Sequence, residues 1–261
     1  MNVFLMTDLE GIADVTDIGF MERGSDKYAA GCAGLERSIN LAVKACFDAG
    51  CDQVYYLDGH GGGGNVNSAM IDSRAEKCDI ASWHTLLREG KINCQIELGA
   101  HARAGTLGGF LDHTMFSDKW FSHRVNGAEM SELSMHALLC AAYGVRIVGC
   151  TGDQTACEQA QEYIPGILTG AVKRALCRNQ AVINPDADRI LYDTVLEAVK
   201  GCCSVPLMAV PSPLEVELTF YRTDMCEEAL SRAESGVLRV DARTLRRIVQ
   251  KLTDYSQLCF F

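Results

Sequence analysis

The chain has 261 residues, of which 48% are hydrophobic and 22% charged, so it can bury a core and is unlike a disordered protein. Its formal net charge is −10. That balance disfavours a nucleic acid as a partner, because phosphate binding needs clustered Lys and Arg. No apolar run approaches the ~18 residues that cross a bilayer, so we expect no membrane partner.

The thirteen cysteines are scattered, odd in number and without any CxxC pair. This pattern favours free thiols in a reducing compartment over a disulfide framework or a four-cysteine zinc module. The apolar run at residues 3–6 is cut off by Asp8 and Glu10 and lacks the basic start of a signal peptide. We therefore expect a cytoplasmic protein.

In the first 200 residues, apolar segments alternate with amphipathic ones. Residues 2–6 predict a strand, and Ser25 or Asp26 caps a helix that runs to about residue 49, with Gly50 as its stop. Further strands are expected at residues 53–57, 92–98 and 146–150, and further helices at residues 127–142, 154–163 and 185–199. Strands joined by long helices run parallel. We expect an α/β fold with a three-layer, mostly parallel sheet flanked by helices.

Beyond residue 200 the pattern changes. Residues 214–220 alternate between apolar and polar side chains, which is typical of a half-exposed antiparallel strand. Another strand is expected at residues 237–240 and a terminal helix at residues 243–258. These segments divide the chain into an α/β metal-binding catalytic domain, residues 1–200, and a smaller α+β part, residues 201–261.

Unusual polar residues follow four of the expected strands. They stand in Asp8-Leu9-Glu10-Gly11, Asp58-Gly59-His60-Gly61, Gly99-Ala100-His101-Ala102-Arg103 and Gly152-Asp153. Ligands of an open parallel sheet bind beyond the carboxyl ends of its strands. We therefore expect these side chains to surround one crevice.

The residue types in this crevice indicate a metal. Asp8 and Glu10 are two residues apart, so in an extended segment both carboxylates leave the same face, and a divalent cation would relieve their repulsion. His60, His101 and Glu132 add further ligands. Oxygen and imidazole donors suit zinc, manganese or cobalt, and five ligands allow two metal ions bridged by one carboxylate.

Several other features have ordinary explanations. Residues 61–64 are all glycine and form either a flexible turn or a phosphate cradle. His84 and His123 have no carboxylate motif beside them, and we interpret both as structural. His136 stands one helical turn after Glu132 and is a weak candidate for supporting it. His113 is a metal ligand, a proton shuttle or a plain loop residue.

Taken in order, these motifs resemble the zinc-dependent D-aminopeptidase family over residues 1 to about 175; they include His113, Ser131-Glu132-Leu133 and Val172-Lys173. The resemblance implies a peptidase with two zinc ions per chain that releases N-terminal D-amino acids from short peptides. It implies that Asp8 bridges the zinc ions, that Glu10 and His101 complete one site, and that His60 and Glu132 complete the other. His113 matches the family's catalytic histidine, which we expect to act as a base or proton shuttle.

The resemblance also implies a ring-shaped homodecamer whose sites face an inner chamber. The segment from His101 to His113 is one residue longer than is usual in the family, which would affect the substrate pocket more than the metals. Asp153 is the candidate partner for the free amino group of the substrate.

Two other functions remain open. One is a peptide-binding or transport-associated protein with a non-catalytic metal site, although structural zinc sites are normally closed and rich in cysteine. The other is a metal-dependent hydrolase of a different amide or ester, for which the lack of clustered Lys and Arg disfavours phosphate substrates.

Overall fold

The computed structural model describes residues 1–260, which form two β-sheets. The first sheet has seven strands in the order β3-β2-β1-β4-β7-β8-β9. All neighbours in it are parallel except β9, which runs antiparallel to β8. The strands are β1 (Asn2–Thr7), β2 (Gln53–Asp58), β3 (Ala75–Cys78), β4 (Cys94–Ala100), β7 (Arg146–Asp153), β8 (Leu168–Cys177) and β9 (Gln180–Ile183).

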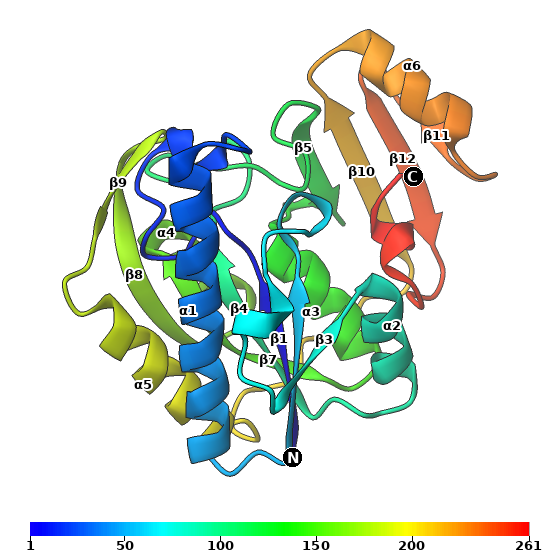
Figure 1. Ribbon diagram of the computed structural model, residues 1–261. Helices are drawn as coiled ribbons and strands as arrows, with labels where there is room; N and C mark the ends of the chain where they lie inside the picture. The colour runs from blue at the N-terminus through cyan, green and yellow to red at the C-terminus, as the bar shows by residue number, and fades with distance from the viewer. Residues whose placement is uncertain (261) are drawn as a thin grey trace.

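Helices cover both faces of this sheet (Figure 1). Helices α1 (Asp26–Asp48) and α5 (Ala187–Lys200) pack against each other on one face. On the other face lie α2 (Ile80–Arg88), α3 (Glu132–Ala142) and α4 (Gln154–Tyr163). Trp83 of α2 contacts both Phe4 of β1 and His136 of α3. The three-layer, mostly parallel α/β architecture predicted from the sequence is therefore confirmed.

Helix α1 shows why the alternation could be predicted. Ser25 caps it by accepting a hydrogen bond from the backbone N–H of Tyr28 at 3.0 Å. The helix then buries Leu35, Ile39 and other apolar residues at helical spacing against the sheet. It ends before Gly50, whose φ of +91° suits glycine best.

The second sheet is antiparallel, with the order β11-β12-β10-β5-β6, and it stands beside the first with α6 (Thr223–Arg232) packed on it (Figure 1). Because β5 and β6 precede residue 200, this sheet draws on both of the expected parts of the chain. The division at residue 200 stays a prediction. The strands are β5 (Trp120–Val125), β6 (Ala128–Glu129), β10 (Leu214–Phe220), β11 (Leu238–Arg239) and β12 (Thr244–Val249).

The predicted terminal helix at residues 243–258 is wrong. Strand β12 and a short 3-10 helix, Tyr255–Leu258, occupy that range. Leu245 and Val249 are both buried and four residues apart, a spacing that also fits a helix. Pairing with β10, which sets Leu245 opposite Leu218, decides for the strand.

The predicted helix at residues 127–142 begins later, at Glu132. Asn126 and Gly127 have φ angles of +51° and +80° and form the turn between β5 and β6. Asn-Gly is a strong signal for such a hairpin turn, and the sequence analysis overlooked it. Helix α3 starts only after its own cap, Ser131.

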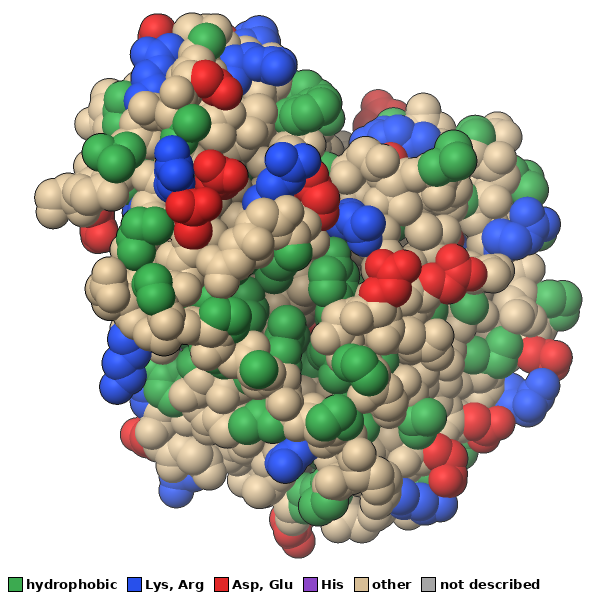
Figure 2. All heavy atoms as spheres, turned by 180° about the vertical axis from the view of Figure 1, so that it is seen from behind, with side chains coloured by type: hydrophobic (Ala, Val, Ile, Leu, Met, Phe, Trp, Pro, Cys, Tyr) green, Lys and Arg blue, Asp and Glu red, His purple; other side chains and the backbone are tan. Residues whose placement is uncertain are grey.

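No helix among residues 1–260 is long and apolar enough to cross a membrane. All thirteen cysteines are free thiols, and most are buried. On the face seen from behind, basic and acidic side chains are interspersed, and hydrophobic side chains surround a hollow near its middle (Figure 2).

Candidate metal centre and active site

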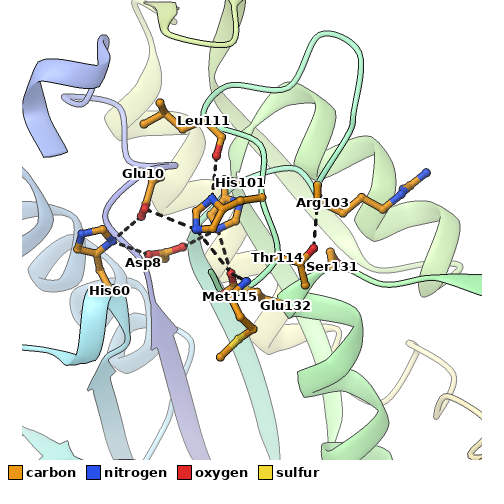
Figure 3. Close-up of polar contacts among 12 residues, drawn as sticks. Asp8, Glu10, His60, His101, Arg103, Leu111, Thr114, Met115, Ser131 and Glu132 are labelled. Carbon is orange, nitrogen blue, oxygen red and sulfur yellow. Dashed lines mark hydrogen bonds and ion pairs between the residues drawn. The ribbon is translucent and has the colours of Figure 1, made fainter. Parts of the chain in front are cut away.

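The carboxyl ends of three neighbouring strands bring the predicted metal residues together (Figure 3). Asp8 and Glu10 follow β1, His60 follows β2 and His101 follows β4. The first residue of α3, Glu132, approaches from the side. His113 joins them from the segment that links β4 to β5.

The first group of ligand atoms consists of Asp8, Glu10 and His60, which each offer an atom within 4.8 Å of the others. His60 Nδ1 lies 2.7 Å from Glu10 Oε2 and 3.5 Å from Asp8 Oδ1. The Glu10 and His60 side chains are nearly buried, with 7% and 14% exposed. This spacing is short enough for one ion to touch all three residues.

The second group consists of His101, His113 and Glu132, at the same mutual spacing. His101 Nε2 lies 3.4 Å from Glu132 Oε1, and His113 Nε2 lies 3.9 Å from the same oxygen. The two imidazole rings are stacked, with centroids 4.0 Å apart. Each Nδ1 faces a backbone carbonyl, at 3.0 Å for Ala102 and 2.8 Å for Leu111. A carbonyl only accepts, so each Nδ1 carries a proton and each Nε2 points into the site.

Asp8 lies between the two groups. Its Oδ1 faces His60, and its Oδ2 is 3.3 Å from His101 Nε2. Glu10 is thus closest to His60, whereas Glu132 is closest to His101. This grouping differs from the pairing that the resemblance implies, in which Glu10 goes with His101 and Glu132 with His60.

The charges of the site depend on one another. Burial alone would lower the pKa of His60, but the carboxylates of Asp8 and Glu10 raise it to about 10. Burial alone would raise the pKa of Asp8, but hydrogen bonds from His101 and His60 hold it well below its usual range. Protonated imidazoles therefore balance the clustered carboxylates here. Divalent cations bound between the same groups would supply equivalent positive charge, so the donor set fits such ions.

The glycines of the sequence motifs allow the strand ends to touch. Gly99 has a φ of +80°, and a Cβ there would lie 2.2 Å from the carbonyl oxygen of Asp8. A Cβ on Gly11 would lie 2.1 Å from the carbonyl oxygen of Ala100. In their place, the N–H of Gly11 donates to the Gly99 carbonyl at 2.8 Å. Backbone packed directly on backbone thus holds Asp8 and Glu10 close to His101.

Asp58 positions His60 rather than joining the site. Its Oδ2 accepts a hydrogen bond from the N–H of Asn65, and its Oδ1 accepts from Asn65 Nδ2. Asn65 Nδ2 also donates to the carbonyl of His60 at 2.7 Å. Arg23 donates to the carbonyl of Gly61. These bonds favour a structural turn over a phosphate cradle for the glycine run.

Two residues beside His113 have strained backbones, and the sequence gave no signal for either. Leu111 and Met115 have φ angles of +47° and +60°, although neither is glycine. The Leu111 carbonyl accepts the Nδ1 proton of His113, and the Met115 N–H donates to Glu132 Oε1 at 2.7 Å. Strain of this kind concentrates at functional sites. Here it supplies the backbone groups that orient His113 and Glu132.

A cavity of about 90 Å³ adjoins Asp8, His101 and Glu132. Its walls are largely apolar and include Met6, Leu57, Ile80, Leu98 and Leu133. His136 also lines it, with Nδ1 at 3.2 Å from Glu97 Oε2. His136 therefore lies next to the site, but its ion pair is with Glu97 and not with Glu132.

The remaining candidates lie apart from the ligand groups. Asp153 is fully buried, and its Oδ2 accepts a hydrogen bond from the N–H of Phe110 at 3.2 Å. A substrate could reach it only if the segment around Phe110 moved, so its predicted contact with the substrate stays a prediction. His84 faces Asp254, and His123 is buried against the carbonyl of Leu258, which are structural settings.

Comparisons with known proteins point the same way as this geometry. A family model described as D-aminopeptidase, peptidase family M55, matches residues 1–259. A D-aminopeptidase of Bacillus subtilis (strain 168) is 26% identical over 237 residues, which cover 88% of this chain and 85% of the relative.

Among solved structures, this chain is similar to the Zn-dependent D-aminopeptidase DppA from Bacillus subtilis, which is described as a self-compartmentalizing protease. The TM-score is 0.90 at 23% sequence identity, and the match covers 99% of this chain and 95% of the other. The family match extends well beyond residue 175 and includes both sheets. The chain therefore belongs to the D-aminopeptidase family of peptidases.

Proposed function

We propose that the chain is a binuclear zinc aminopeptidase that removes N-terminal amino acids of D configuration from short peptides or amides. The observation that carries this proposal is the convergence of three carboxylates and three imidazoles at one edge of the sheet. Oxygen and nitrogen donors without thiolate suit a catalytic zinc site. The family match supports the reaction, and the solved structure with the same fold is named as zinc-dependent.

The contacts favour one distribution of ligands over the two ions. Asp8 offers one oxygen to each side, so we assign it the bridge. Glu10 and His60 would hold one zinc, and His101 and Glu132 the other, because these are the closest pairs. We propose this pairing in place of the one implied by the resemblance.

When bound, two zinc ions supply Lewis acidity, which polarises a peptide carbonyl and makes water acidic enough to react near pH 7. The protein moves the proton. His113 Nδ1 is committed to the Leu111 carbonyl, so Nε2 is the atom that takes up and releases a proton. It lies 4.0 Å from Glu10 Oε1 and 3.9 Å from Glu132 Oε1, between the two groups. We assign it delivery of the proton to the departing amine.

The cavity beside the metal residues orients the substrate. Its volume of about 90 Å³ and its apolar walls suit the short side chain of an N-terminal residue. Tyr255 and Ile80 line the same cavity, and their side chains would exclude water from the bound residue.

The test is release of amino acid from matched pairs of D- and L-aminoacyl amides by zinc-loaded protein. We expect release from the D series, and loss of that release in metal-free protein. Release no faster than in the metal-free control would contradict the proposal. Carboxylic and phosphate esters in the same panel test the alternative hydrolase, and turnover that His113→Gln leaves unchanged would favour a peptide-binding protein.

We also propose that the chain acts in the cytoplasm as a homodecameric ring. The self-compartmentalizing description of the solved structure supports self-association, and free thiols suit a reducing compartment. Leu107 is 98% exposed and Leu176 is 61% exposed, which are costly for a lone chain. Light scattering should give about 284 kDa, ten chains of 28.4 kDa; the mass of a single chain would contradict the ring.

A further inference from the structure

Lys173 of β8 is a buried charged side chain that the proposed reaction does not use. It is 1% exposed, and its Nζ lies 4.2 Å from the centroid of the Phe110 ring. An ammonium group so far from water is costly unless it is well paired. The groups that surround it therefore indicate why it is there.

Three backbone carbonyls receive the protons of Lys173. Its Nζ donates to the carbonyl of Glu10, to that of Ile12 at 2.9 Å and to that of Val15 at 2.6 Å. An ammonium group has three protons and no acceptor, so these three carbonyls satisfy it completely. All three belong to the turn that follows β1, which is the segment that presents Asp8 and Glu10 to the site.

The same position also connects to the segment that carries His113. Lys173 stands opposite Asp153 in the pairing of β7 with β8. Asp153 is completely buried, and its Oδ2 accepts the N–H of Phe110, three residues before His113. Among residues 1–260, its Oδ1 has no hydrogen-bond partner. A buried carboxylate beside a buried ammonium thus joins the two segments behind the metal residues.

We propose that Lys173 is a positioning residue for the metal centre: by holding the carbonyls of Glu10, Ile12 and Val15 on one atom, it directs the Glu10 carboxylate toward His60. This inference rests on the proposed two-zinc site and adds a residue outside the ligand set. Outer residues that orient metal ligands change metal affinity or activity about 10- to 100-fold when they are replaced.

The position also argues against a purely stabilising role. Arginine cannot replace this contact geometrically, because its donors diverge in a planar fork while an ammonium group concentrates three on one atom. A hydrophobic side chain could fill the space, but it would leave three carbonyl groups without this donor. The lysine is thus matched to the shape of the turn that carries the ligands.

The experiment compares Lys173→Met with Arg174→Met, which removes a positive charge from an exposed position one residue along the same strand. Zinc affinity is measured by competition with a chelator of known affinity, and the fold is checked by circular dichroism. For Lys173→Met we expect one of the two zinc equivalents to bind 10- to 100-fold more weakly, with the other changed less than threefold. Arg174→Met should bind both as the wild type does.

Lys173→Met that folds and binds both equivalents within twofold of the wild type would overturn the proposal. Equal weakening of both equivalents would also overturn it, because general loosening of the fold predicts that result. If Lys173→Met does not fold, Lys173→Arg decides by hydrogen exchange. Amides of residues 8–15 should then exchange at least tenfold faster than in the wild type, and unchanged exchange there would contradict the role.

The wild type separates this inference from the proposed function. Wild-type protein that binds no zinc would remove the proposed function itself. Wild-type protein with two zinc ions, matched by a folded Lys173→Met with the same affinities, would remove only the positioning role.

Discussion

The carboxyl edge of the parallel sheet and the antiparallel sheet both bury a histidine, and they affect it in opposite ways. At the parallel edge, Asp8 and Glu10 overcome the effect of burial and raise the pKa of His60 to about 10. In the antiparallel sheet, burial lowers the pKa of His123 to about 4, and its Nε2–H donates to the Leu258 carbonyl. Burial alone keeps a histidine neutral; converging carboxylates are what distinguish the edge that can hold cations.

The largest expected effect separates the two histidine environments by activity. His113→Gln should lower kcat about 10²- to 10⁴-fold, because it removes the group that moves a proton. The zinc content should stay unchanged, since Asp8, Glu10, His60, His101 and Glu132 remain. Steady-state kinetics and elemental analysis of the same sample check both points.

The matched control for that change is His123→Gln in the antiparallel sheet, which should leave kcat unaltered. Loss of a zinc ion from His113→Gln together with activity would contradict its role as a proton shuttle and make His113 a ligand.

Gly99→Ala should disrupt the parallel edge. The residue has a φ of +80°, and an added Cβ would lie 2.2 Å from the Asp8 carbonyl oxygen. We expect a loss of about 2–4 kcal/mol in the free energy of unfolding, measured with urea. Gly90→Ala is the control, because its φ is +63° but no atom lies within 4 Å of its Cβ. Equal losses in the two variants would mean that the close approach at the strand ends does not matter.

Removal of metal should affect the parallel edge first. Ions that bind only the folded chain stabilise it by about 2.7 kcal/mol at a hundred times their Kd. Chelation should therefore lower Tm by several degrees and speed hydrogen exchange near residues 8–11 more than in β10 and β12. A Tm that chelation leaves unchanged would argue against bound cations at this edge.

A smaller effect tests the other histidine. His123 is neutral in the folded chain, with a pKa of about 4, whereas the unfolded chain takes up a proton near pH 6.5. The unfolded state therefore binds more protons below pH 6.5, and folding stability falls as the pH drops toward 4. Between pH 7 and pH 5 the wild type should lose about 2 kcal/mol more than His123→Gln. Parallel curves for the two proteins would contradict this environment for His123.

The parallel edge could be predicted from the sequence because each of its parts is local. A short apolar strand followed by Asp8 or by His101 is visible in a few residues, and parallel topology then brings the strand ends together. The capped helix α1 and the alternating strand β10 are equally local signals. Within this part of the molecule, the glycines at positions 11 and 99 were readable as motif members before their packing role was known.

The antiparallel sheet could not be predicted as well, because its strands pair across long separations in the chain. Strand β12 carries apolar residues at a spacing that fits either secondary structure, and only its pairing with β10 decides. The strained backbones at Leu111 and Met115 carry no composition signal, because glycine is the usual marker for positive φ. Lys173 likewise has no sequence feature that would show its burial.

The most direct test of the central claim is the zinc content of protein purified without exposure to chelator. Two equivalents per chain, with one lost in His60→Ala and one in His101→Ala, is the result that we predict. A single equivalent, or none in a folded and monodisperse sample, would contradict the view that these side chains together hold a pair of ions.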